Sequence, residues 1–97
     1  MGFGNLGEAY RRNRQFDKAM EAFEEAIAQM PEFLMGHLGI ANTLRDQGKF
    51  KEATARFRLS LAINPTFAPA YHYLGLTFVD QERLKEAIPL LRKAAAL

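Results

Sequence analysis

The chain has 97 residues, no cysteine, and 13 basic against 11 acidic side chains, for a formal net charge of +2. This length suits one domain, and so small a positive excess favours neither nucleic acid nor an anionic membrane as a partner. No apolar run approaches the roughly eighteen residues of a membrane span, and the first ten residues lack a signal pattern, so membrane insertion is not expected. The absence of cysteine slightly favours a reducing, cytoplasmic compartment and otherwise leaves localisation open.

Amphipathic helices are predicted along the whole chain. In residues 16–30, apolar side chains recur at the i, i+3, i+4, i+7 spacing of one helix face, and charged side chains fill the other face. Pro31 and Pro65 disfavour helical geometry at the residue before them, so a helix should end there. The pattern predicts short links, hence antiparallel neighbours, between helices at 2–13, 16–29, 33–46, 50–63, 67–80 and 84–96.

The chain also repeats itself at a fixed interval. Adding 34 to a residue number carries Phe16 onto Phe50, Ala19 onto Ala53, Phe23 onto Phe57 and Pro31 onto Pro65. A helix-turn-helix period of this length, with the pattern W-x2-L-G-x2-Y, then A-x3-F, then P, is the signature of one repeat family.

On these residues the sequence resembles tetratricopeptide repeats over its whole length. The first unit fills the pattern with Phe3, Leu6, Gly7, Tyr10, Ala19, Phe23 and Pro31. The second departs in its first helix, with His37, Ile40, Ala41 and Leu44, and matches at Ala53, Phe57 and Pro65. The third matches at Tyr71, Leu74, Gly75, Phe78, Ala87 and Leu91. The units span about 1–33, 34–67 and 68–97, and we expect a chain of nearly three repeats to be a piece of a longer array.

The resemblance implies an all-α fold, a right-handed superhelical solenoid of three antiparallel helix hairpins that forms a single domain over residues 1–97. Ala19 and its repeats are small where the two helices of a hairpin should approach closest, and Gly7 and its repeats should serve the same closeness from the facing helix. Phe23 and its repeats should fill the space between one hairpin and the next.

The resemblance also places a partner on the concave face, which the first helix of each hairpin builds. Asn5 and Asn42 could hold a peptide backbone, because an amide both donates and accepts, although a solvated residue is an equal explanation. Leu38, Leu76 and Val79 are apolar where the hairpin core does not need them. For Leu76 and Val79, contact with a further repeat is the alternative. The expected groove consists of Asn5, Glu8, Arg12, Leu38, Asn42, Arg45, His72, Tyr73, Leu76 and Val79, with Met1, Gly4, Arg11, Met35, Asp46 and Asp80 on the same face.

Acidic chaperone tails and nucleic acid are not expected partners. Some relatives grip the C-terminal carboxylates of chaperones with Lys, Asn and Arg on this face. Nucleic acid would need basic and stacking aromatic residues along the groove, and only its first end is basic. The positions that match the carboxylate clamp hold Gly4, Glu8, Gly39, Pro69 and Tyr73 instead.

Catalysis, a metal and a cofactor are not predicted. His37 and His72 are the only imidazoles, and the sequence has no HExxH spacing and no glycine-rich phosphate loop. His37 occupies an aromatic core position and should be packed, whereas His72 could face either a bound peptide or solvent.

The leading hypothesis is therefore a protein-interaction scaffold that captures a peptide or helix of a partner protein in its concave groove. The alternative is a structural module that binds copies of itself. Ile88, Leu91 and Ala95 on the last helix should stay exposed where a further hairpin would pack, and they could form a weak homodimer.

Overall fold

The computed structural model describes residues 2–97, so Met1, which the sequence placed on the concave face, lies outside the described residues. Every helix boundary within that range falls within one residue of the prediction, because prolines and turn residues act locally. Residues 2–97 form six helices and no strand: α1 (Phe3–Arg12), α2 (Phe16–Gln29), α3 (Leu34–Asp46), α4 (Phe50–Ile63), α5 (Ala68–Asp80) and α6 (Leu84–Ala96).

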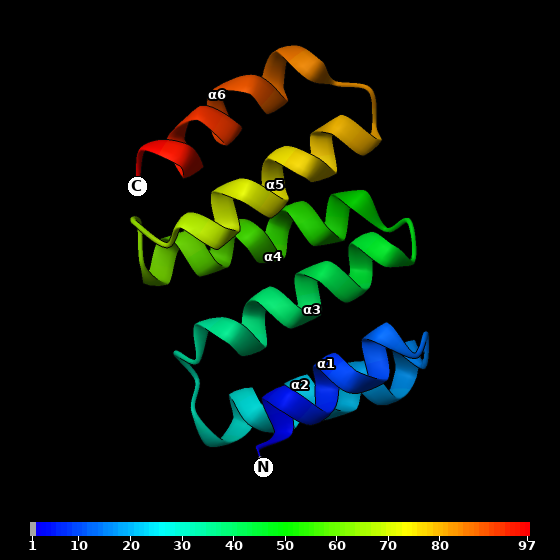
Figure 1. Cartoon of the computed structure of the whole chain (residues 1–97). Helices are drawn as coiled ribbons and strands as arrows, with labels where there is room; N and C mark the ends of the chain where they lie inside the picture. Colours follow the sequence, from blue (N-terminus) through cyan, green and yellow to red (C-terminus); the bar gives the residue numbers. More distant parts are fainter. Residues whose placement is uncertain (1) are drawn as a thin grey trace.

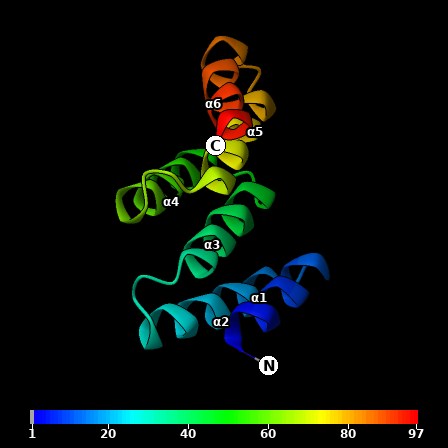
Figure 2. The same cartoon turned by 60° about the vertical axis from the view of Figure 1, so that its left-hand side comes forward.

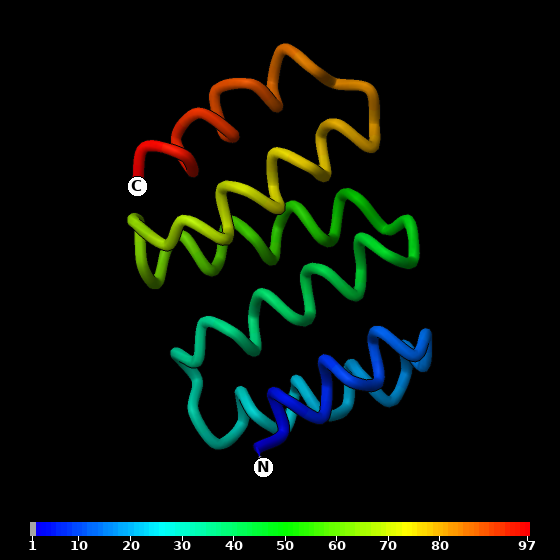
Figure 3. The backbone as a smooth tube through the Cα atoms, in the orientation of Figure 1, coloured from blue at the N-terminus to red at the C-terminus, as the bar shows by residue number. Residues whose placement is uncertain are grey.

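The six helices pair into three hairpins, α1 with α2, α3 with α4 and α5 with α6, which stack along one direction (Figure 1). The ends of the chain lie at opposite ends of this stack, and each hairpin is turned relative to the one before it (Figures 2 and 3). The first helices lie side by side, since α1 contacts α3 and α3 contacts α5. The fold is the all-α solenoid of three helix hairpins that the sequence predicted, with extents of 37 × 25 × 18 Å.

Phe23 joins the first hairpin to the second. Its side chain is 2% exposed, and it lies against two glycines, because a Cβ added to Gly7 would stand 2.7 Å from its ring and one added to Gly39 only 2.2 Å. Glycine in the first helix therefore makes room for the large residue of the second helix. The expected reason for Gly7 was close approach to Ala19; Ala19 is fully buried, but the side chain that needs the space is Phe23.

The turn inside each hairpin uses the same cap. Arg14, Gly48 and Glu82 occupy the same position in successive repeats and have φ of 58°, 77° and 59°, in the left-handed region. The amide of Gly48 donates to the carbonyl of Arg45, and the next amide donates to the carbonyl of Leu44. This pair of bonds is the Schellman motif, which satisfies carbonyls that a helix end leaves free.

The connection between hairpins is held by a side chain of the following helix. His37 is 4% exposed, and its Nε2 lies 2.8 Å from the carbonyl oxygen of Pro31. Since a carbonyl only accepts, Nε2 donates, and Nδ1 can accept from Arg56 Nη1 at 3.4 Å. Tyr71 repeats the contact, with its hydroxyl donating to the carbonyl of Pro65 at 2.9 Å. His37 is the packed histidine that the sequence predicted.

Candidate functional site

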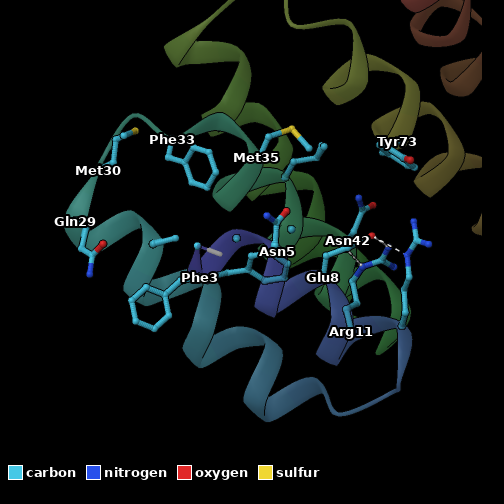
Figure 4. Close-up of a pocket in the computed structure, with 17 residues that line it drawn as sticks. Phe3, Asn5, Glu8, Arg11, Gln29, Met30, Phe33, Met35, Asn42 and Tyr73 are labelled. Carbon is cyan, nitrogen blue, oxygen red and sulfur yellow. Dashed lines mark hydrogen bonds and ion pairs between the residues drawn. The ribbon is translucent and has the colours of Figure 1, made fainter.

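A cavity of about 780 Å³ opens on the row of first helices, where α1, α3 and the end of α2 meet and Tyr73 of α5 forms one edge (Figure 4). We call it the groove cavity. Phe3, Met30 and Phe33 stand on one side of it, and Glu8, Arg11 and Tyr73 stand on the other. It is lined by Gly2, Phe3, Gly4, Asn5, Glu8, Arg11 and Arg12 from α1 and the residue before it, Phe23, Ala26 and Gln29 from α2, Met30 and Phe33 from the turn, Met35, Leu38, Gly39 and Asn42 from α3, and Tyr73.

Some of the groove residues expected from the sequence line the groove cavity, and others do not. Arg45, His72, Leu76 and Val79 lie outside it: Leu76 is half-buried, Val79 is 37% exposed, and His72 stands edge-on to Tyr73, 5.0 Å between ring centres. The expected residues that do line it are Asn5, Glu8, Arg12, Leu38, Asn42 and Tyr73.

Leu38 was expected to be free of the hairpin core, and this was wrong. It is 5% exposed and belongs to the main apolar cluster while also lining the groove cavity. Helix α3 is the middle first helix of the stack and contacts α1, α2, α4 and α5, so most of its sides are covered.

Sequence reasoning placed Met35 on the groove face but missed Phe3, Met30 and Phe33 at the apolar end of the groove cavity. Phe3, Met30 and Met35 are 39%, 59% and 53% exposed, and Phe33 is half-buried beside them. Phe3 had been assigned to the repeat pattern, Met30 to the apolar face of the second helix, and Phe33 to the start of the third helix. The signal available was the density of large apolar residues in the short segment 30–35, because such residues rarely cluster in a solvated turn.

The charged end of the groove cavity is neutralised internally. Arg11 donates from Nε and Nη2 to the two carboxylate oxygens of Glu8, at 2.8 Å each, and from Nη1 to Asp46 at 2.7 Å. Arg12 adds a contact of 3.2 Å to Glu8. The hydrogen bonds from Arg11 are the main reason that the pKa of Glu8 lies below its usual value, and Glu8 raises the pKa of Arg11 in turn, so both groups are charged.

Asn42 stands in the wall of the groove cavity. Its side chain lies between the charged end and Tyr73 (Figure 4), and the residue is 7% exposed. Within residues 2–97 its Oδ1 is buried and has no hydrogen-bond partner. The solvated alternative considered for the two asparagines therefore fits Asn5, which is exposed, and does not fit Asn42.

Arg45 is engaged within the fold. Its Nε donates to Asp80 Oδ2 at 2.8 Å, and its side chain is 21% exposed. The same pairing occurs one repeat earlier between Arg11 and Asp46. Each pair links the ends of two adjacent first helices.

The outer face of α6 carries the residues expected to self-associate. Ile88 is 52% exposed and Ala95 is exposed, but Leu91 is half-buried. A Cβ added to Gly75 would stand 2.7 Å from Leu91, so this leucine fills the same glycine-lined space inside its hairpin that Phe23 fills in the first. The expectation that Leu91 stays exposed was therefore wrong. A second cavity of about 580 Å³ lies beside it, lined by Ala68, Pro69, His72, Tyr73, Leu91, Ala94 and Ala95.

Residues 2–97 contain no helix that is long and apolar enough to cross a membrane. In the same range, no three His, Asp or Glu side chains gather in a way that could hold a metal ion.

The geometry of stacked hairpins agrees with the comparison with known families. A model of the tetratricopeptide repeat matches residues 10–77, and a second one matches residues 68–97. The chain belongs to the tetratricopeptide repeat family. No curated protein sequence matches it.

Several solved structures are similar in fold to this chain. The TPR domain of OM64 from Arabidopsis has a TM-score of 0.87 at 23% identity, over 98% of this chain and 78% of that chain. A crystal structure of MamA has a TM-score of 0.83 at 22% identity, over 97% of this chain and 55% of that chain. The structure of MamA of AMB-1 has a TM-score of 0.79 at 22% identity, over 98% of this chain and 52% of that chain. The chain thus spans about half the length of these MamA structures, and identities this low show the fold alone.

Proposed function

We propose that this tetratricopeptide repeat chain is a protein-interaction module that binds an extended or helical segment of a partner protein along α1, α3 and α5, without catalysis. The observation that carries the proposal is the groove cavity. Its volume of about 780 Å³ is within the range of ligand sites, and it combines exposed apolar side chains with a few polar groups. Repeat stacks present their first helices as a continuous binding surface, which fits this position.

Peptide display against the chain, followed by calorimetric titration of the selected peptides, tests this function. Met35→Glu places a carboxylate among the apolar residues of the groove cavity, so it should weaken binding at least about tenfold through desolvation. Leu59→Glu is the matched control, because Leu59 is also a largely exposed apolar helix residue, 43% exposed, and it does not line the groove cavity. Equal losses for both variants, or full affinity for Met35→Glu, would contradict the proposal.

Self-association through α6 is the second candidate function, supported by the exposure of Leu84 and Ile88, at 56% and 52%. A two-fold contact would cover both stripes at once, but association must first offset about 4 to 15 kcal/mol of lost freedom, so the dimer would be weak. Light scattering or sedimentation over a wide concentration range measures it. Ile88→Glu should abolish any dimer, and it is a cleaner test than Leu91→Glu because Leu91 also packs against Gly75. A parent chain that stays monomeric at every concentration excludes this function.

A further inference from the structure

The groove cavity has an apolar end whose depth comes from glycines. Phe33 can lie against α1 because residue 4 has no side chain; a Cβ on Gly4 would stand 2.9 Å from Phe33 Cε2. Gly39 plays the same part for Phe23, whose ring forms part of the lining. Together with the exposed Met35, these residues enclose a space that prefers a large apolar group to water.

The opposite end offers little free charge to a partner. Two carboxylates, Glu8 and Asp46, share Arg11 and Arg12, so the formal charges sum to zero. A charged ligand group would have to compete with bidentate contacts of 2.8 Å. Arg12 keeps most of its surface in water, with a side chain 77% exposed, where salt screens its attraction for an anion. Electrostatic attraction therefore cannot be the main source of affinity here.

The buried amide of Asn42 stands on the charged side of the groove cavity, between the charged end and Tyr73 (Figure 4). Its Oδ1 is an acceptor and has no partner among the described residues, so a donor from a binding partner would satisfy it. An extended peptide offers backbone N–H groups along its length, and one of these can donate to Oδ1. A free apolar molecule would leave Asn42 unsatisfied.

We infer that the groove cavity receives one large uncharged apolar side chain of an extended peptide segment, while a main-chain N–H of that segment donates to Asn42 Oδ1. This inference rests on the function proposed above and specifies the chemistry of the partner: an apolar anchor residue flanked by accessible backbone, rather than an acidic or basic tail.

The inference is tested by NMR titration of the 15N-labelled full chain with blocked pentapeptides, acetyl-Ser-Gly-X-Gly-Ser-amide, in which X is Leu, Phe, Ala, Glu or Lys. The Leu or Phe peptide should shift the amide signals of Gly4 and Gly39 saturably, and the Ala, Glu and Lys peptides should bind at least about tenfold more weakly. Affinity should change less than about twofold between about 50 mM and 500 mM NaCl, since no net charge is neutralised.

Backbone recognition by Asn42 is tested with the Asn42→Leu variant and with peptides N-methylated at one amide at a time. One N-methyl group should weaken binding to the parent chain by about tenfold and should have no further effect on the variant, as two changes to one contact do not add. Thermal melting of the variant checks that it is folded. If Asn42→Leu does not fold, the N-methyl series on the parent chain still decides: an unchanged affinity for every N-methylated peptide overturns the contact.

The remaining outcomes separate this inference from the function proposed above. Suppose that the peptides shift the amide signals of Leu76 and Val79 and leave those of Gly4 and Gly39 unchanged. The proposed binding along the first helices would then stand, but the inference that the groove cavity receives the apolar side chain would be overturned. If the Glu or Lys peptide binds more tightly than the Leu and Phe peptides, the inference that the bound side chain is uncharged is overturned. If neither these peptides nor display-selected ones shift any residue of α1, α3 or α5, the groove function fails together with the inference.

Discussion

Arg45 Nε lies 2.8 Å from Asp80 Oδ2, across the junction of the second and third hairpins. The pair reproduces, one repeat later, the contact of 2.7 Å between Arg11 and Asp46. Each arginine is near the end of one first helix, and each aspartate is the last residue of the next first helix. Position 79, where a third arginine would stand, holds Val79. The described chain thus has two links of an ion-pair ladder that joins α1, α3 and α5.

A double-mutant cycle on Arg45→Ala and Asp80→Ala should give a coupling of about 0.2 to 1 kcal/mol in urea unfolding, because the pair is only partly exposed. The coupling should shrink as salt is added. Arg83 and Glu86, a more exposed pair within α6 and its cap, provide the comparison and should couple less. A coupling of zero would mean that the ladder does not hold the first helices together.

Glu82→Gly should stabilise the chain. Glu82 has φ of 59°, and a left-handed conformation costs a residue with a side chain about 1 to 2 kcal/mol, against roughly 0.5 to 1 kcal/mol for the extra freedom of unfolded glycine. The midpoint of urea unfolding should therefore rise, and Gly48→Ala at the equivalent turn should lower it. Arg14→Gly is less clean, since Arg14 also lies over the ring of Phe16 at 5.1 Å. A drop in stability for Glu82→Gly would show that its side chain is needed at the turn.

Gly39→Ala should destabilise the chain, because the cost of overpacking should exceed the gain in helix propensity. Propensity alone favours alanine by about 1 kcal/mol, but the new Cβ would lie 2.2 Å from Phe23 Cε1, and such overpacking costs about 1 to 3 kcal/mol or more. Unfolding measurements should show a net loss, which Phe23→Leu in the same chain should partly relieve. Gly36→Ala, whose Cβ would stand 3.0 Å from Ile27, is the control and should lose less. Stabilisation by Gly39→Ala would mean that Phe23 can move aside freely.

The Glu8 carboxylate should make stability depend on pH in the acid range. Hydrogen bonds from Arg11 keep its pKa in the folded chain below the usual value of 4.5, so the unfolded chain binds the proton more readily. Its contribution is fully present above the unfolded pKa and is lost as pH falls through the lowered folded pKa.

The melting temperature of the parent should thus exceed that of Glu8→Gln at neutral pH, and the difference should shrink on acidification below about pH 4.5. Glu24→Gln, at an exposed position of α2, serves as the control. A difference between parent and Glu8→Gln that does not vary with pH would contradict this account.

The positions of the helices and their pairing into hairpins could be predicted from the sequence. Pro31 and Pro65 disfavour helical geometry at the residue before them, and the apolar spacing of residues 16–30 defines a helix face without knowledge of its neighbours. The repeat period then arranged the helices into three hairpins and placed His37 in a core position, where the structure has it. These features depend on local residue patterns and on their repetition every 34 residues, both of which are present in the sequence itself.

The tertiary structure alone decided what the first helices do together. Arg11 and Asp46 are 35 residues apart, and only the stacking of α1 on α3 brings Nη1 within 2.7 Å of Oδ2. Because these two charges pair with each other, they are less available to a binding partner. The same stacking buries Leu38 and Asn42 and joins Phe3 to Met35 in one cavity. Side chains on different repeats meet at angles and depths that depend on whole-helix packing, as with the rings that fit against Gly4 and Gly39, and no periodic pattern within one helix encodes those distances.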